Sequence, residues 1–114
     1  GIADAEKRAS RATGQGVIES YIHQGNRLGA IIEINCETDF VARTSEFKDL
    51  AKNLAMQVAA MDPASIDNDN DSLMEQQYIK DSDKLIKELV QEVIAQTGEN
   101  IKIKRFQRFE VGGE

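Results

Sequence analysis

Hydrophobic residues alternate with polar or small ones in several segments of the chain, and this two-residue period is typical of β-strands. Residues 28–37 show the alternation best, so they predict a strand with one fully apolar face. Residues 17–23 predict a strand before it, and the Gln-Gly-Asn-Arg sequence at 24–27 predicts the turn of a hairpin. The apolar face of the 28–37 strand consists of Leu28, Ala30, Ile32, Ile34 and Cys36.

A third predicted strand, residues 101–111, has an irregular pattern. Ile101 and Ile103 share one face, whereas Phe106 falls on the opposite face together with Arg108. Either a β-bulge shifts the phase within the strand, or both faces are covered over part of its length. A second copy of the chain could supply that cover, with Phe106 and Arg108 at a dimer interface. The alternative is that Phe106 closes the edge of its own core, as buried aromatic residues commonly do.

The best helical pattern follows residue 43. Thr44 or Ser45 can cap the first turn, and the helix should end by Asp62, because Pro63 disfavours helical geometry at the residue before it. Residues 64–77 are polar and rich in Asp and Asn, so they predict a loop with one helical turn near its end. The apolar residues at helical spacing are Phe47, Leu50, Ala51, Leu54, Ala55 and Val58.

A second helical pattern is predicted to start at Asp81 or Ser82 and to end at Gly98, which suits a left-handed C-terminal cap. Residues 2–11 favour a helix by propensity, but their thin apolar stripe predicts a frayed one. Residues 1–15 are therefore interpreted as an N-terminal linker or helix, and residues 16–114 as one core domain.

The order strand, strand, helix, helix, strand predicts an α+β domain, in which a three-stranded antiparallel sheet has both helices packed on one face. The length of 114 residues fits a single domain. With 20 acidic and 14 basic residues, the net charge of −6 disfavours nucleic acid as a partner. No apolar run approaches the roughly 20 residues that cross a membrane, and no signal-peptide pattern is visible.

Few residues suggest chemistry. The lone Cys36 can form neither an internal disulfide nor a zinc site, so a reducing compartment such as the cytoplasm is expected. The acidic run at 67–71 resembles the start of an EF-hand loop, but Ser72 stands where the glycine is required and Tyr78 where the glutamate is required. We therefore expect no metal site, no cofactor and no catalytic residue. A small enzyme would require a carboxylate pair such as Glu33 and Glu37 to converge in a cleft.

The connection after the second strand places one large ring beside one carboxylate, at Phe40 and Asp39. Connections often carry function, since a scaffold can present their side chains to a partner. The alternative is that Phe40 packs beneath its own loop and Asp39 caps a turn.

Residues 33–43 read EINCETDFVAR, and this block resembles the signature of elongation factor Ts, the guanine-nucleotide exchange factor of elongation factor Tu. The resemblance extends back to Gly14, with its Gly-x-x-x-x-Tyr-Ile-His pattern, and forward through residues 46–60, 77–81 and 98–109. In longer members of the family a helical domain precedes this point, and the region corresponding to residues 62–77 is larger. The chain thus resembles a short, single-core member.

The resemblance implies that the chain binds elongation factor Tu and promotes GDP release without covalent chemistry. Phe40 would wedge between helices of the partner and, with Asp39, disturb its Mg²⁺ site. Thr38 and Val41 would fix the turn, and Arg43 would add a rim contact. The resemblance also implies a homodimer and a location in the cytoplasm or an organelle. The alternative function is a domain that binds elongation factor Tu, or another protein, without exchange activity.

Overall fold

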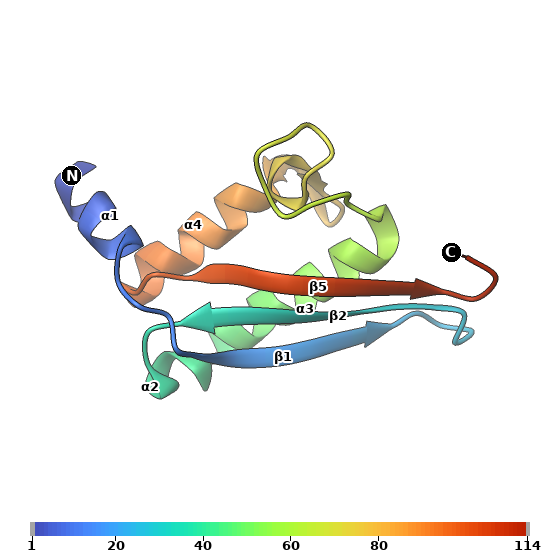
Figure 1. The fold of residues 1–114 in the computed structure, drawn as a ribbon, viewed down its shortest axis with the longest axis horizontal. Helices are drawn as coiled ribbons and strands as arrows, with labels where there is room; N and C mark the ends of the chain where they lie inside the picture. Colours follow the sequence, from blue (N-terminus) through green and yellow to red (C-terminus); the bar gives the residue numbers. More distant parts are fainter. Residues whose placement is uncertain (1, 114) are drawn as a thin grey trace.

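A three-stranded antiparallel sheet forms one layer of the structure, a computed structural model that describes residues 2–113 and the side chains from residue 4 onward (Figure 1). The sheet has the order β1-β2-β5, made of β1 (Gln15–Ile22), β2 (Leu28–Cys36) and β5 (Lys102–Glu110). Residues 23–27 join β1 to β2 as a hairpin, and the backbone N–H of His23 donates to the carbonyl of Leu28 at 2.8 Å. The predicted α+β class, with its three-stranded antiparallel sheet, is confirmed.

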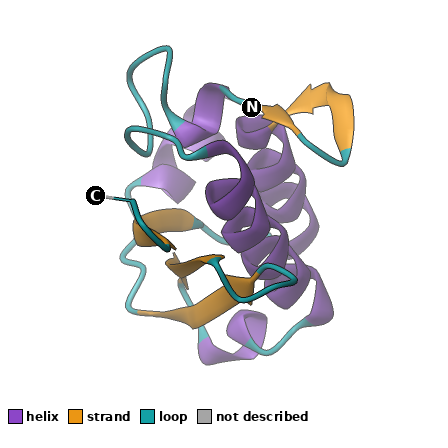
Figure 2. Cartoon of the chain, turned by 90° about the vertical axis from the view of Figure 1, so that its right-hand side faces the viewer, coloured by secondary structure: helices purple, strands orange, loops and turns teal. Residues whose placement is uncertain are grey.

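Helices cover one face of this sheet (Figure 2). The long helix α3 (Ser45–Met61) packs across all three strands, and α4 (Ile86–Thr97) packs against α3. The helix α3 ends as predicted, since Asp62 adopts a left-handed conformation before Pro63. Gly98 likewise caps α4 with a φ of 74°. The core lies between the sheet and these helices.

The two faces of the sheet differ sharply in environment. The face of β2 that was predicted to be apolar is buried under α3, and Ile32, Ile34 and Cys36 are at most 1% exposed. The opposite face carries no helix among the described residues, and exposed apolar side chains from all three strands lie on it. This open face includes Ile18, Ile22, Ile31 and Phe109.

A β-bulge explains the irregular pattern of the last strand. Ile103 pairs with Ile34, but Arg105 pairs with Glu33, so Lys104 is an extra residue in β5. The phase shift turns Phe106 toward the helices, where it is half-buried against the core. Arg108 also points to the helical side, and its Nε donates to the carbonyl of Ala59 at 2.9 Å. The predicted dimer contact through Phe106 and Arg108 stays a prediction, although both side chains already have contacts within the chain.

The predicted start of the second helix was wrong. Residues 81–85 form strand β4 (Asp81–Leu85), which pairs with β3 (Gln77–Tyr78), and α4 begins only at Ile86. A tertiary contact holds this small hairpin, because the buried Gln57 donates to the Gln77 carbonyl at 3.0 Å and accepts from the Ile79 backbone N–H at 3.0 Å.

The structure also contains shorter helices. The predicted turn near Leu73 is a 3₁₀ helix, η1 (Leu73–Glu75). The first helix, α1 (Ile2–Ala9), lies at the end of the sheet where β2 ends and β5 begins (Figure 1). No described helix is long and apolar enough to cross a membrane.

Candidate functional site

A four-residue helix, α2 (Asp39–Ala42), stands where the sequence predicted a plain connection after β2. Thr38 has extended backbone geometry, and its Oγ1 accepts a hydrogen bond from the Val41 backbone N–H at 3.2 Å. This is the usual arrangement of an N-terminal cap. Val41 and Ala42 are buried, so α2 is anchored to the core by one side.

The other side of α2 displays Phe40 to solvent. Its side chain is 79% exposed, the largest exposed fraction among the large hydrophobic residues described. The alternative in which Phe40 packs beneath its own loop is therefore wrong. A groove of about 450 Å³ runs beside the ring and reaches from the start of α3 to the end of α4. The groove is lined by Phe40, Val41, Thr44, Glu46, Gln96 and Thr97.

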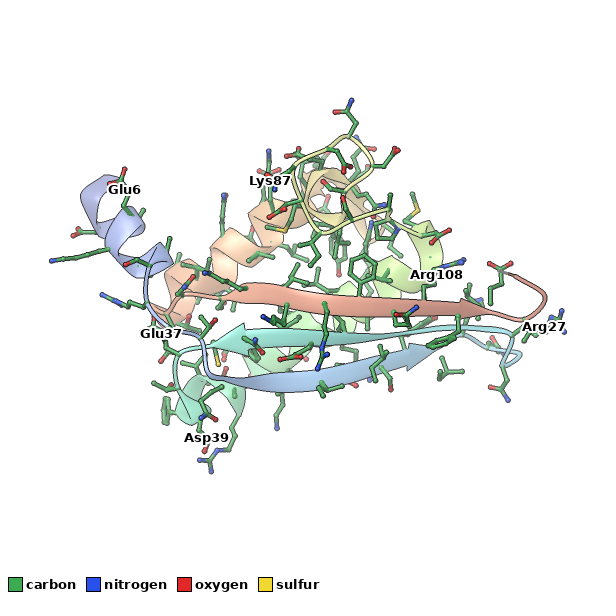
Figure 3. The ribbon with its side chains drawn as sticks, viewed as in Figure 1. Glu6, Arg27, Glu37, Asp39, Lys87 and Arg108 are labelled. Carbon is green, nitrogen blue, oxygen red and sulfur yellow. The ribbon has the colours of Figure 1, made fainter. Side chains whose placement is uncertain are left out.

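Asp39 and Arg43 form an ion pair with each other, one helical turn apart, and both side chains are exposed. Asp39 is not the capping residue, since Thr38 has that position. In this arrangement Arg43 holds the carboxylate of Asp39 beside Phe40. We call α2 and its junction with α3 the corner; Figure 3 shows it below the end of β2, where Asp39 is labelled. A rim contact of Arg43 with a partner stays a prediction.

The joint between α2 and α3 is fixed by Thr44, as the sequence predicted for the cap of α3. Its hydroxyl donates to the Val41 carbonyl at 2.7 Å and accepts from the Phe47 backbone N–H at 3.3 Å. Phe47 is fully buried, so the joint is tied to the centre of the core. The two helices therefore hold Phe40 on a defined corner.

Sequence reasoning missed the residues that hold this corner from the side of β5. The carboxylate of Glu99 accepts from the backbone N–H groups of Glu37 at 3.1 Å and Thr38 at 3.0 Å, and from the Thr38 hydroxyl at 2.6 Å. In return, the Glu37 carboxylate accepts from the Asn100 backbone N–H at 2.6 Å. More than 60 residues separate the partners along the chain, so no local pattern could have paired them.

The buried side chain of Asn100 extends the same network to the N-terminal segment. Its Nδ2 donates to the carbonyls of Ala9 at 3.2 Å and Arg11 at 2.8 Å. Arg11 also lies 3.6 Å from the carboxylate of Glu37. The end of α1 is therefore bonded to the network that reaches Thr38.

Cys36 is a buried residue next to Thr38, and its environment does not favour reactivity. It is fully buried on the core face of β2, as predicted, and its Sγ donates to the Thr38 carbonyl at 3.2 Å. Burial raises the pKa of the thiol above its ordinary value of 9.0, and the negative charge of Glu99 adds to that shift. A protonated, enclosed thiol is a poor nucleophile.

The carboxylates considered for catalysis do not converge. Glu33 lies on the open face of the sheet and pairs with Arg105 at 2.8 Å. Glu37 lies beyond the strand end, about 13 Å further along an extended chain, and bonds to Asn100. Among the described residues, no group of three or more histidine, cysteine or acidic side chains gathers to hold a metal ion.

The chain is similar in sequence to known translation factors. A family model described as elongation factor TS matches residues 5–71. Elongation factor Ts of Thermotoga neapolitana is 42% identical over the whole of this chain and 78% of its own length. The chloroplastic elongation factor Ts of Guillardia theta is also 42% identical, over 98% of this chain and 70% of its own length. The alignment with the Thermotoga protein spans 153 positions, so that relative has segments with no counterpart in these 114 residues.

Proposed function

The chain belongs to the elongation factor Ts family, and from this we propose that it binds elongation factor Tu and accelerates the release of GDP. The observation that carries the proposal is the exposure of Phe40, 79%, on a helix whose opposite side is buried. A large apolar side chain that is held in place but left uncovered is available to a partner. Phe40 also lies within residues 33–43, the segment that resembles the family signature.

The mechanism is differential binding. A protein that binds the nucleotide-free form of its partner more tightly than the nucleotide-bound form shifts the partner toward release. In this proposal the Phe40 ring enters between helices of elongation factor Tu, and the displaced helices no longer support the Mg²⁺ that anchors the phosphates. No acid, base or metal from this chain takes part, so the function is not covalent catalysis.

The neighbouring residues have separate roles. Asp39 contacts the partner beside the ring, and its pair with Arg43 limits its orientations. Thr38 and Val41 set the position of α2, by capping it and by anchoring it in the core. Arg43 adds a contact at the rim. The site of action is the bacterial cytoplasm or an organelle, which fits the chloroplastic relative from Guillardia theta.

Release of a fluorescent GDP analogue from elongation factor Tu tests the proposal directly. The chain should speed release in proportion to its concentration, because each encounter shifts the partner toward its nucleotide-free form. Binding to elongation factor Tu without faster release would instead support the alternative, an exchange-inactive binding domain. Absence of binding would refute both functions for this chain.

Self-association through the open face of the sheet is a second proposal, favoured by exposed apolar side chains on all three strands. Ile18 and Phe109 are each 65% exposed, and Ile31 lies between them on the central strand. Such a face is a common site of protein contact. Sedimentation should give twice the mass of the chain, and Ile31→Lys should give a monomer. A wild-type chain that sediments as a monomer at every concentration tested would contradict this proposal.

A further inference from the structure

Glu99 has an unusual set of bonds for a half-buried carboxylate. Both of its oxygens are engaged by the two residues that precede α2, and none of these donors is a cation: two are backbone N–H groups and one is the Thr38 hydroxyl. Hydrogen bonds from neutral donors to a carboxylate are about twice as strong as those between neutral groups. These bonds therefore fix Glu37 and Thr38 more firmly than a surface ion pair would.

One atom, the Oγ1 of Thr38, connects Glu99 to α2, because it bonds to both. A hydroxyl has one proton to donate, and at Thr38 that proton goes to Glu99 at 2.6 Å. The lone pairs of Oγ1 are then turned toward the Val41 backbone N–H, which lies 3.2 Å away. Glu99 thus orients the hydroxyl that caps the helix carrying Phe40.

From this geometry we infer that Glu99 is a positioning residue for nucleotide exchange, which acts by holding Thr38 and α2 so that Phe40 meets the partner at a fixed angle. The inference rests on the proposed function, and it adds to the site a residue that lies 61 positions after Thr38 in the sequence. The reciprocal bond from the Asn100 backbone N–H to Glu37 closes the contact from the other side. We call these four residues, Glu37, Thr38, Glu99 and Asn100, the clasp.

The clasp also holds α1. Asn100, a member of the clasp, donates hydrogen bonds to the carbonyls of Ala9 and Arg11, at the end of α1 and just after it. Figure 3 shows α1, marked by Glu6, at the same end of the molecule as Glu37 and Asp39. The bonds of Glu99 itself go to Glu37 and Thr38, so a change at Glu99 acts first on the corner that presents Phe40, whereas α1 is held by Asn100.

The variant Glu99→Ala removes all three bonds, and Glu99→Gln keeps an acceptor for the two backbone N–H groups. We expect Glu99→Ala to slow GDP release from elongation factor Tu about tenfold, the size of one hydrogen bond to a charged group. Glu99→Gln should recover part of the loss. Glu92→Ala is the matched control, since Glu92 is an acidic residue on α4 that pairs with Lys84 at 2.8 Å and has no bond to the clasp.

A double-mutant cycle with Phe40→Ala separates positioning from general stabilisation. The affinity for nucleotide-free elongation factor Tu is measured for the wild-type chain, each single variant and the double variant. If Glu99 acts through Phe40, Glu99→Ala weakens the wild-type affinity but changes that of the Phe40→Ala chain less than about twofold. Thermal unfolding is measured for every variant, and Glu99→Gln replaces Glu99→Ala in the cycle if the alanine variant does not fold.

The outcomes are distinct. Slower release with a non-additive cycle supports the inference. Equal losses in both backgrounds, or a lower melting temperature with normal release, would overturn it and leave Glu99 a stabilising residue. If Phe40→Ala slows release while Glu99→Ala does not, the inference fails and the proposed function stands. If the wild-type chain does not accelerate release, the proposed function fails and the inference falls with it.

Discussion

Replacing Phe40 with alanine should separate folding from exchange, because the ring contributes little to the fold. Only about a fifth of the side chain is covered in the structure, since 79% of it is exposed. Full burial of a phenylalanine is worth about 1.5 to 3 kcal/mol, so the covered part contributes roughly 0.3 to 0.6 kcal/mol to folding. The melting temperature of Phe40→Ala should therefore lie close to that of the wild-type chain.

The uncovered four fifths of the ring are the part that a partner can bury. At the same scale this surface is worth about 1.2 to 2.4 kcal/mol, which corresponds to an eightfold to sixtyfold change in an equilibrium, in round numbers. We expect Phe40→Ala to weaken binding to nucleotide-free elongation factor Tu by that factor and to slow release of a fluorescent GDP analogue to a similar extent. Both assays use the same proteins.

Two other phenylalanines serve as controls. Phe109→Ala removes a ring that is 65% exposed on the open face of the sheet, and it should leave release unchanged. Phe47→Ala removes a fully buried ring and should cost about 3 to 5 kcal/mol of stability. If Phe40→Ala unfolds the chain as Phe47→Ala does, or if Phe109→Ala slows release as much as Phe40→Ala, the reasoning is refuted.

Three further changes test the structure around the site. Thr38→Ala removes the cap of α2 and a bond to Glu99, and it should lower the free energy of unfolding by about 1 to 2 kcal/mol in a denaturant titration. Gly16→Ala should destabilise the chain by about 1 to 3 kcal/mol, because the added Cβ would lie 2.1 Å from the Ile34 carbonyl oxygen; Gly14→Ala, which meets nothing within 4 Å, is its control. The raised pKa of Cys36 keeps the folded thiol protonated where the unfolded one ionises, so stability should fall as pH rises above 9.0. Cys36→Ala should show a smaller fall, and an equal fall would exclude the thiol as the cause.

The sequence predicted the main layers because they follow from local periodicity. The alternation from Leu28 to Cys36 identified the central strand and its buried face, and the spacing after Thr44 identified α3. Pro63 and Gly98 marked the ends of the two long helices, since proline disfavours helical geometry at the residue before it and glycine adopts the left-handed cap without a steric cost. These features depend on residues that are neighbours along the chain.

The errors arose where distant residues decide the local structure. Residues 81–85 carry a pattern that could continue into α4, but the amide of Gln57 holds the preceding segment as a hairpin. The bulge in β5 was one of two open alternatives, and pairing with Glu33 and Ile34 decides it. Glu99 gave no signal as a site residue, because an acidic residue after a helix end is common on any surface.

The contrast between Phe40 and Phe47 explains how one short segment can serve both fold and function. Seven residues apart, the first ring is 79% exposed and the second is fully buried, with Thr44 bonded to the backbone between them. The buried ring and the clasp hold the corner without using the apolar surface of Phe40. Since folding leaves 79% of that surface uncovered, about four fifths of its transfer free energy remains available for a partner. Under the proposed function, an exchange factor that acts by differential binding can use this uncovered surface, which lies on a corner held by the bonds of Glu99 and Thr44.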